Sequence, residues 1–494
     1  MHFNIKNILK SNGFDSKEDY VNIYINLYEA LKKAIINRSL DVKTKLPPSR
    51  VLAKDIEVSR STVIKAYDLL VLEKYIKSIP GSGYYVTSPK NKKILINLNS
   101  NTKKGKYPKI SKRGKSFNKH IIINNSQSNK GIAFRPGLPP LDIFPVQQWN
   151  NLSNHYWRTV KSSELSYSKT IGLDSLRENI ANYLKLYRNI NCGVDQIVVT
   201  SGSLHSLYLL GNALIDKNDE VIIENPTYPH AYHLFDSLNA KICPIAIDNE
   251  GMSVKEIKCQ NPKFVYTTPS NQYPSGIKMS VNRRLELLKW ASNKNTFIVE
   301  DDYDHEFSNW ENPVASIYNL DRQERVIYLG TFNKLLHPSI RLGYMIVPYY
   351  LLDTITALYE QSSRFVTLSM QKTMSLFIEK DYLNKHLRNV IEISVERKQS
   401  FLDYFNLHFN NKISLDSNNT GLHLIGKLKD SIKDIKVANY LSQNGIIAHP
   451  LSNYYIGNNN NNNGLVMGYC SVNNKLIKDN ITKMSKAYER FLIS

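Results

Sequence analysis

The feature that most constrains the fold of this chain is the alternation of helical stretches with short β-rich runs that begins near residue 131. The clearest of these runs are Gln196–Thr200, Glu220–Glu224, Phe264–Thr268, Thr296–Glu300 and Arg325–Leu329. Regular alternation of strands and helices is typical of α/β domains, in which helices cover a largely parallel sheet. Residues 131–494 are therefore predicted to form one large α/β domain.

The first part of the chain has a different pattern. Apolar residues at helical spacing predict three helices, and a Pro-Gly-Ser-Gly turn between two β-rich runs predicts a hairpin. The predicted elements are a helix carrying Ile23, Leu27, Leu31, Ile35 and Ile36, helices over Val51–Ile56 and Thr62–Lys74, and strands over Ile76–Ile79 and Tyr84–Thr87. Three helices followed by a hairpin form a winged helix-turn-helix, which we predict over residues 15–88.

The charge of the chain is unevenly distributed. The sequence has 64 Lys and Arg against 43 Asp and Glu, a net charge of +21. Residues 89–130 hold 12 basic and no acidic side chains, whereas residues 1–88 contribute +5 and residues 131–494 only +4. Such a basic balance indicates an acidic partner, such as nucleic acid or a membrane surface. We predict a basic linker at 89–130, which can be a solvated spacer and can also add phosphate contacts.

Composition and spacing exclude several other classes of protein. The hydrophobic fraction of 42% rules out a mostly disordered chain. The cysteines Cys192, Cys243, Cys259 and Cys470 are scattered without a CxxC pair, so neither a metal site nor a disulfide framework is predicted. We find no signal peptide and no apolar run of ~18 residues, so a cytoplasmic location is expected. The asparagine run at 458–463 is predicted to be a surface loop.

The third predicted helix of the N-terminal domain carries residue types that contact DNA. In a winged helix-turn-helix this helix lies in the major groove, with its first residues facing base edges. Arginine can bond guanine through two hydrogen bonds, serine and threonine contact bases or phosphates, and wing glycines allow close approach to the backbone. The residues predicted to contact double-stranded DNA are Arg50, Ser59, Arg60, Ser61, Thr62, Lys65 and Gly83.

The string LPPSRVLAKDIEVSRSTVIKAYDLLVLEKYIKSIPGSGYYV resembles the GntR-type winged helix. The chain departs from that pattern at Arg38 and Lys74, which stand where glycines are usual. These changes are expected to alter a turn and to leave the DNA-docking face intact. A winged helix that is used only for protein contacts is the alternative interpretation.

Strand ends of the large domain carry residues that together suit an aldehyde cofactor. Lys334 follows a β-run and a small polar stretch, where an amine can form a Schiff base, and the nearby Arg341 offers a fork for a phosphate. Asp301 and Tyr303 share one face of a strand end, so the carboxylate can hold a pyridinium proton and the phenol can bond a ring hydroxyl.

Two further segments complete this set. Gly202 and Ser203 follow a β-run and begin a helix, which is a natural phosphate cradle. Tyr228 stands at another strand end, where an aromatic side chain can stack on a ring. Open α/β sheets bind ligands at the carboxyl ends of their strands, so we expect these side chains to meet in one site.

These segments, together with TPSNQYPSG at 268–276 and EDDYDHEF at 300–307, resemble fold-type I pyridoxal-phosphate enzymes of the aminotransferase class. The resemblance spans roughly residues 131–490 and implies pyridoxal 5'-phosphate as the cofactor. The roles that it implies are the Schiff base for Lys334, the pyridine nitrogen for Asp301, the ring oxygen for Tyr303, the phosphate for Arg341, Ser203 and Thr331, ring stacking for Tyr228 and pocket lining for Asn271.

A GntR-type winged helix, a basic linker and an aminotransferase-like domain in this order are similar to the MocR/GabR family of bacterial transcriptional regulators. The resemblance implies a head-to-tail homodimer that binds DNA and senses a small-molecule effector through bound pyridoxal phosphate. Aminotransferases and GabR-like members grip the substrate carboxylate with arginines, and here His230 and Val466 occupy those positions. Asn333 and Leu204 also replace a usual serine and glutamine.

These departures shape the expectation for the large domain. Amino-acid transamination is expected to be weak or lost, and the effector to be pyridoxal phosphate itself or an amino compound. Two other classes stay open. One is an active aminotransferase with a DNA-binding appendage, whose turnover would survive deletion of residues 1–130. The other is a DNA-binding protein whose large domain is only a dimerisation scaffold, which would purify colourless.

Overall fold

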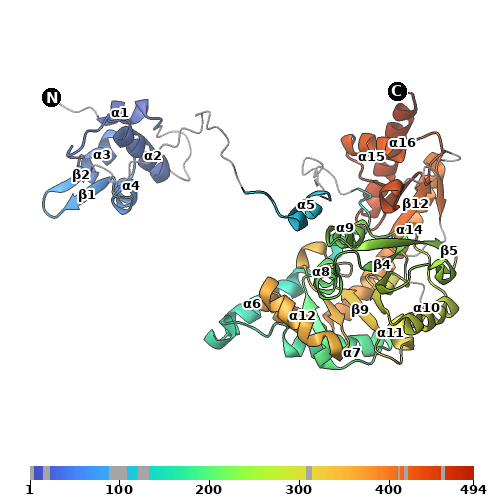
Figure 1. The fold of residues 1–494 in the computed structure, drawn as a ribbon. Coiled ribbons are helices and arrows are strands. Elements are labelled where there is room, and N and C mark those ends of the chain that lie inside the picture. Colours follow the sequence, from blue (N-terminus) through green and yellow to red (C-terminus); the bar gives the residue numbers. More distant parts are fainter. Residues whose placement is uncertain are drawn as a thin grey trace. The chain divides into compact units, whose positions relative to one another are not determined.

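A computed structural model of the chain describes residues 5–14, 23–87, 108–120, 133–307, 314–409, 412–416, 421–457 and 462–493. The chain divides into an N-terminal unit, Met1–Pro108, and a large unit, Lys109–Ser494 (Figure 1). The first unit is a helical domain with a hairpin and the second is an α/β domain, so the predicted fold class is confirmed.

The N-terminal unit packs its helices around one apolar core. Its elements are α1 Ile5–Ser11, α2 Ile23–Ile36, α3 Ser49–Asp55, α4 Arg60–Leu72, β1 Ile76–Ile79 and β2 Gly83–Val86. Leu27 and Leu31 of α2 meet Val63 and Tyr67 of α4 in this core, and all four are buried. The spacing of apolar residues therefore correctly predicted which face of each of these two helices points into the core.

Two details of this unit go beyond the sequence pattern. Residue 15, the predicted start of the domain, lies outside the described residues, but Ile5 and Leu9 of α1 already belong to the core. Arg38 and Lys74, which replace usual glycines, both have a φ of 63°. The backbone therefore keeps the left-handed turn that glycine would favour, and the two residues carry its steric cost.

The large unit is built on an eight-stranded sheet in the order β3-β10-β9-β8-β7-β4-β5-β6. Its strands are β3 Ile197–Thr200, β4 Glu220–Asn225, β5 Lys241–Asp248, β6 Gly251–Met252, β7 Pro262–Thr267, β8 Phe297–Asp301, β9 Val326–Thr331 and β10 Gly343–Ile346. All five predicted β-runs are strands. The pairs β5-β4-β7-β8-β9 are parallel, whereas β10 runs antiparallel between β9 and β3.

Helices cover both faces of this sheet, which explains why its strands are apolar at nearly every position. Along β8, Ile298 packs into one core with α10 and Val299 packs into another with α8 and α9. The same alternation recurs in the neighbouring strands, as expected for side chains that point to opposite faces. The helices that cover the two faces are α8 Ser203–Leu214, α9 Pro229–Ser237, α10 Val281–Lys294, α11 Ile317–Leu320 and α12 Tyr349–Ser362.

The remaining helices flank the sheet or build the C-terminal part. They are α6 Val146–Thr159, α7 Asp174–Arg188, α13 Leu368–Glu379, α14 Tyr382–Phe409, α15 Asp434–Gln443 and α16 Asn474–Ile493. A second sheet has the order β11-β12-β14-β13, with β11 Ser414–Asp416, β12 His423–Lys427, β13 His449–Pro450 and β14 Gly464–Gly468. Among the described residues, no helix is long and apolar enough to cross a membrane.

The predicted linker contains one described helix. Of residues 89–130, the structure describes only 108–120, and α5 Lys112–Asn118 lies there. This helix packs against α9 of the large unit, so at least this part of the predicted linker is docked structure and not free spacer. The asparagine run at 458–463 is described only at its last two residues.

Candidate cofactor site and DNA-contacting face

A cavity of about 300 Å³ opens at the carboxyl ends of the central strands. Seven of the residues predicted for the cofactor line it: Ser203, Tyr228, Asp301, Tyr303, Thr331, Lys334 and Arg341. Leu204, His230 and Asn333, three of the four departures of the large domain from the family pattern, line it as well, whereas Val466 does not. The tertiary fold thus brings together side chains from strand ends that are spread over more than a hundred residues of the sequence.

Lys334 lies in this cavity three residues after β9. Its Nζ donates a hydrogen bond to the main-chain oxygen of Gly137 at 2.7 Å. Burial lowers the pKa of the Lys334 amine, while the charges of Asp304 and Asp301 oppose that shift. A lowered pKa increases the fraction of neutral amine, which is the nucleophilic form.

Gly137 is needed where it stands. It has a φ of 70°, and a Cβ at this position would lie 2.6 Å from the Nζ of Lys334. A side chain here would therefore displace the amine. No local sequence signal marks this glycine, because its contact with Lys334 joins positions 197 residues apart.

Asp301 is the last residue of β8 and has one satisfied and one unsatisfied oxygen. Its Oδ2 accepts a hydrogen bond from the hydroxyl of Tyr266 at 3.0 Å. Its Oδ1 is buried and has no hydrogen-bond partner among the described residues. Burial raises the pKa of Asp301 to about 7, against the opposing effects of hydrogen bonds from Tyr266 and Ser203. A buried acceptor without a donor is costly, so this oxygen suits a ligand that brings a proton.

This raised pKa predicts a pH-dependent stability of the cofactor-free protein. Because the pKa of Asp301 is raised from 3.8 to about 7, the stability that its protonated form contributes is lost as the pH rises through this interval. We expect the free energy of unfolding of Asp301→Asn, relative to that of the wild type, to increase by up to about 3 kcal/mol between about pH 5 and pH 8. Denaturant unfolding of both cofactor-free proteins across this range measures it, and a difference that does not change with pH would contradict it.

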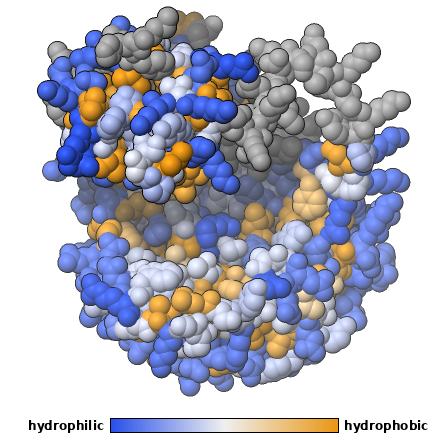
Figure 2. Space-filling model, turned by 90° about the vertical axis from the view of Figure 1, so that its left-hand side faces the viewer, coloured by the Kyte–Doolittle hydropathy of each residue, from blue (hydrophilic) through white to orange (hydrophobic). Residues whose placement is uncertain are grey.

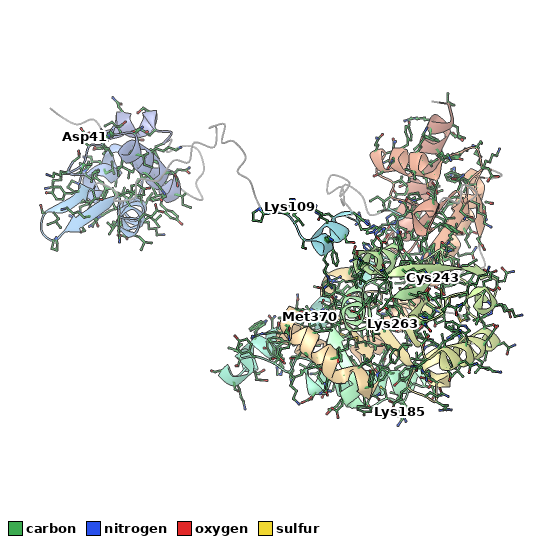
Figure 3. All side chains as sticks on the ribbon, viewed as in Figure 1. Asp41, Lys109, Lys185, Cys243, Lys263 and Met370 are labelled. Carbon is green, nitrogen blue, oxygen red and sulfur yellow. The ribbon has the colours of Figure 1, made fainter. Side chains whose placement is uncertain are left out.

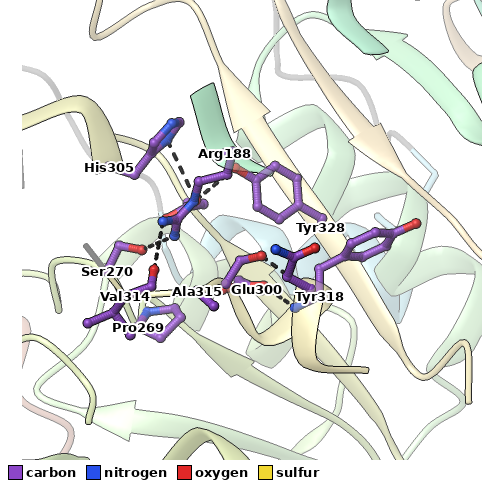
Figure 4. Close-up of polar contacts among 12 residues, drawn as sticks. Arg188, Pro269, Ser270, Glu300, His305, Val314, Ala315, Tyr318 and Tyr328 are labelled. Carbon is purple, nitrogen blue, oxygen red and sulfur yellow. Dashed lines mark hydrogen bonds and ion pairs between the residues drawn. The ribbon is translucent and has the colours of Figure 1, made fainter. Parts of the chain in front are cut away.

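A buried ionic network behind β8 holds Asp301 in place (Figure 4). Because side chains alternate along a strand, Glu300 and Asp302 point away from the cavity. Arg188 donates from Nε to Asp302 Oδ2 at 2.8 Å, and the hydroxyl of Tyr328 donates to the same oxygen at 2.7 Å. Glu300 accepts from the main-chain N–H of Ile317 at 2.9 Å. These contacts give the cavity wall a rigid support.

The part of the cavity at the start of α8 is suited to an anion. Ser203 is the first residue of α8, and Gly202 before it has a φ of 105°. The N–H groups at a helix start and the helix dipole attract phosphate. Arg341 also lines the cavity, and its guanidinium makes no hydrogen bond or ion pair with another described residue. Thr331, the last residue of β9, adds a hydroxyl.

Two aromatic side chains, those of Tyr228 and Tyr303, also line the cavity. Tyr228 caps the start of α9 and lines the cavity, and Tyr303 lines it from the end of β8. The hydroxyl of Tyr303 donates to the main-chain oxygen of Asn271 at 3.0 Å. The side chain of Asn271 donates to Asp304 Oδ1 at 2.8 Å, so Asn271 lies behind the lining and positions its neighbours.

Sequence reasoning missed Tyr266, Thr268, Tyr273 and Pro338 among the lining residues. Tyr266 lies in β7, and its only signal was an aromatic residue in a strand beside the one that ends in Asp301. Strand order cannot be derived from such a pattern. The hydroxyl of Tyr266 became visible as a partner of Asp301 only when β7 and β8 were paired.

The residues predicted to contact DNA lie in three places of the N-terminal unit: Arg50 in α3, Gly83 in β2, and the other five at or near the start of α4. Arg50, Ser59, Arg60, Ser61 and Lys65 are exposed, and Thr62 and Gly83 are half-buried. The helix begins at Arg60 because the Ser59 side chain accepts from the N–H of Thr62 at 3.1 Å. Ser59 therefore acts first as the helix cap. Arg60, Ser61 and Lys65 extend from an N-terminal turn without acidic residues, which favours phosphate.

Family models match both units. The model described as bacterial regulatory proteins, gntR family, matches residues 23–86. The model described as aminotransferase class I and II matches residues 143–460. A crystal structure of an archaeal alanine:glyoxylate aminotransferase superposes with a TM-score of 0.71 at 24% identity, covering 77% of this chain and 98% of that chain.

Two relatives resemble the chain over nearly its whole length. The probable rhizopine catabolism regulatory protein MocR of Rhizobium meliloti is 30% identical over 95% of this chain and 94% of its own. The HTH-type pyridoxine biosynthesis transcriptional regulator PdxR of Corynebacterium glutamicum is 26% identical over 93% of this chain and 95% of its own.

A gntR-type DNA-binding domain joined to an aminotransferase class I and II domain defines a class of transcriptional regulators. Within that class, the match to a relative across both domains shows that this chain belongs to the MocR/GabR family. The regulator interpretation of the sequence is thereby confirmed, and the aminotransferase-like cavity is to be understood as part of a regulator.

Proposed function

We propose that the protein binds operator DNA through its N-terminal unit and pyridoxal 5'-phosphate through the cavity, and that the bound cofactor changes its affinity for DNA. The observation that carries this proposal is the unpaired Oδ1 of Asp301 in the same cavity as the buried Lys334. The Oδ1 of Asp301 lacks a proton donor, and the side chain of Lys334 ends in a buried amine. A protonated pyridine ring that carries an aldehyde satisfies both.

Each lining residue then has a physical task. Pyridoxal phosphate supplies an aldehyde that links covalently to an amine and a ring that withdraws electrons. Lys334 offers the amine, Asp301 holds the ring nitrogen proton, and Tyr228 packs on the ring. Ser203 and Arg341 bind the phosphate at the start of α8, where the N–H groups of a helix start favour an anion.

The cavity lacks the usual means to hold an amino-acid carboxylate. Burial lowers the pKa of His230, so this side chain is neutral near pH 7. Val466 is buried with Ile425, Leu451 and Tyr454 in an apolar cluster. A neutral ring and an aliphatic side chain do not replace a charged fork. We therefore propose that pyridoxal phosphate itself is the effector, which agrees with the pyridoxine biosynthesis role in the name of the PdxR relative.

This effector proposal predicts slow conversion of bound cofactor by amino acids. We expect the wild-type protein, mixed with excess amino acids, to turn over to the pyridoxamine form far more slowly than His230→Arg, which restores one arm of the carboxylate fork. Absorbance spectra over time measure both rates. Fast conversion by the wild type would support an aminotransferase with a DNA-binding appendage, and deletion of residues 1–130 would then leave its turnover intact.

A head-to-tail homodimer is part of the proposal. The surface of the large unit carries exposed apolar side chains around the end of α6, with Trp157 56% and Tyr167 79% exposed. Leu165 beside them is also exposed. The face shown in Figure 2 likewise has hydrophobic residues among hydrophilic ones. Clustered apolar exposure favours association with a second copy, which would present two DNA-binding units to two half-sites.

Helix α5 supplies a physical route by which the cavity can influence the chain that leads to the DNA-binding unit. The Nε2 of His120, just after α5, lies 2.6 Å from Asp236 Oδ2 of α9, and its ring stacks on His233 at 4.5 Å. Arg113 of α5 donates to Asn212 of α8. Helix α8 begins at Ser203 and α9 carries His230, and both of these residues line the cavity. A shift of these helices on cofactor binding therefore reaches α5.

We expect Asp236→Ala to weaken this coupling. The variant loses the His120 contact but no lining residue, so its affinity for pyridoxal phosphate should stay within about twofold. The ratio of DNA affinities with and without the cofactor should move towards one, from a coupling of order 5–150-fold. Fluorescence anisotropy with operator DNA measures this ratio. Glu489→Gln, which breaks a surface pair with Lys412, is the matched control.

DNA footprinting upstream of the protein's own gene and of neighbouring genes, with and without pyridoxal phosphate, tests the proposal as a whole. We expect protection of two half-sites that changes when the cofactor is added. Identical footprints in both conditions would remove the sensing role. A protein that binds DNA but stays colourless and resists borohydride labelling at Lys334 would leave the large unit as a scaffold.

A further inference from the structure

Three potential metal ligands meet at the amino-terminal end of the main sheet. Glu220 is the first residue of β4, Cys243 lies in β5, and Cys259 lies in the loop before β7. One carboxylate oxygen and the two Sγ atoms all lie within 4.8 Å of one another. All three residues are half-buried, and Figure 3 marks Cys243 on the large unit. The cofactor cavity lies at the other ends of these strands, so the cluster is a separate feature.

The spacing of these atoms suits one metal ion. Zn²⁺ binds thiolates at ~2.3 Å in tetrahedral geometry, which places two sulfur ligands about 3.8 Å apart. Three donors that already lie within 4.8 Å need only a small closure around the ion. Two thiolates and a carboxylate favour zinc-type, thiophilic cations over Mg²⁺ or Ca²⁺, which prefer oxygen ligands alone.

The carboxylate of Glu220 is held by neighbours in the way that metal ligands commonly are. Its Oε2 accepts from the main-chain N–H groups of Gln260 at 2.9 Å and Asn261 at 3.2 Å. Its Oε1 accepts from the Nζ of Lys241 at 2.9 Å. The loop that carries Cys259 therefore also orients the carboxylate. Three anionic ligands around a divalent cation leave one negative charge, which Lys241 balances.

We propose that Glu220, Cys243 and Cys259 bind one thiophilic divalent cation of the Zn²⁺ class, with the fourth position open to water. Cys243 and Cys259 are 16 positions apart without a CxxC motif, which is why the sequence pattern predicted no metal site. The pairing of β4 with β5 and the return of the loop before β7 create the cluster.

The test uses the full-length reduced protein and Cd²⁺ as a spectroscopic probe. We expect a thiolate-to-cadmium absorbance band that saturates at one ion per chain and is displaced by Zn²⁺. Cys243→Ser and Cys259→Ser should each lose the band, and Glu220→Gln should weaken binding by about 10–100-fold. Cys192→Ser, a half-buried cysteine outside the cluster, should keep it. Lys334→Ala should also keep it, which separates this proposal from the cofactor proposal.

A second measurement does not depend on variants that fold. In the wild-type protein, Zn²⁺ should protect Cys243 and Cys259 from alkylation, as mapped by peptide mass spectrometry, and leave Cys192 unchanged. The proposal is overturned if the band survives in Cys243→Ser, if Cys192→Ser removes it equally, or if the reduced protein binds no Cd²⁺. A Cys243–Cys259 disulfide that forms again in air after such a negative titration would identify a redox pair instead.

Discussion

Lys334→Ala is expected to retain no pyridoxal phosphate after borohydride reduction and dialysis, whereas the wild-type protein should retain about one per chain. The reason is that the covalent link needs the amine of Lys334, which lies buried in the cavity with a lowered pKa. Among the described residues, no other lysine lines this cavity. Mass spectrometry of the reduced protein measures the loss, and peptide mapping of the wild type should place the added mass on Lys334.

The same variant should also lose most of the effect of the cofactor on DNA. We expect the ratio of DNA affinities with and without pyridoxal phosphate to fall from 5–150-fold towards one. Lys334→Arg is the matched control because it keeps the positive charge but cannot form the link. A full cofactor response in both variants would show that non-covalent binding is sufficient and that Lys334 is not the sensor.

The second large effect concerns DNA recognition. Arg60→Ala is expected to weaken operator binding by about 1–3 kcal/mol, or roughly 5–150-fold, and to relax specificity at one base pair. The physical reason is the place of Arg60, exposed in the first turn of α4, where the only hydrogen bond of its side chain to another described residue is a long one of 3.4 Å to Ser49. Anisotropy titrations with operator and scrambled duplexes measure both quantities.

Lys10→Ala is the control for this effect, because it removes the same charge from the same unit. Lys10 lies on α1, away from α4 and the hairpin in Figure 1. An equal loss in both variants would indicate that Arg60 contributes only general charge.

Neutralised linker lysines should instead lower the dependence of DNA binding on salt concentration, since each lost phosphate contact reduces the slope of the logarithm of the binding constant against the logarithm of salt concentration by about 0.9. An unchanged slope would reduce the linker to a spacer.

The candidate site could be predicted largely from local signals. Asp301, Tyr303 and Thr331 stand at the ends of apolar runs, and such runs become buried parallel strands whose carboxyl ends meet at one edge. Lys334 and Arg341 could be included because their spacing matched a known pattern. The contacts that tune these residues could not be predicted, because Tyr266 and Gly137 contact Asp301 and Lys334 from strands and loops that are far away in the sequence.

The sequence by itself determined the element types, the two-part organisation and seven of the residues that line the cavity. These follow from periodicity and strand ends, which are local properties of the chain. Only the tertiary structure decided the antiparallel place of β10, the unpaired oxygen of Asp301, the docking of α5 on α9 and the meeting of Cys243 with Cys259. Each of these depends on which distant segments become neighbours, and that choice is made by packing of the whole core.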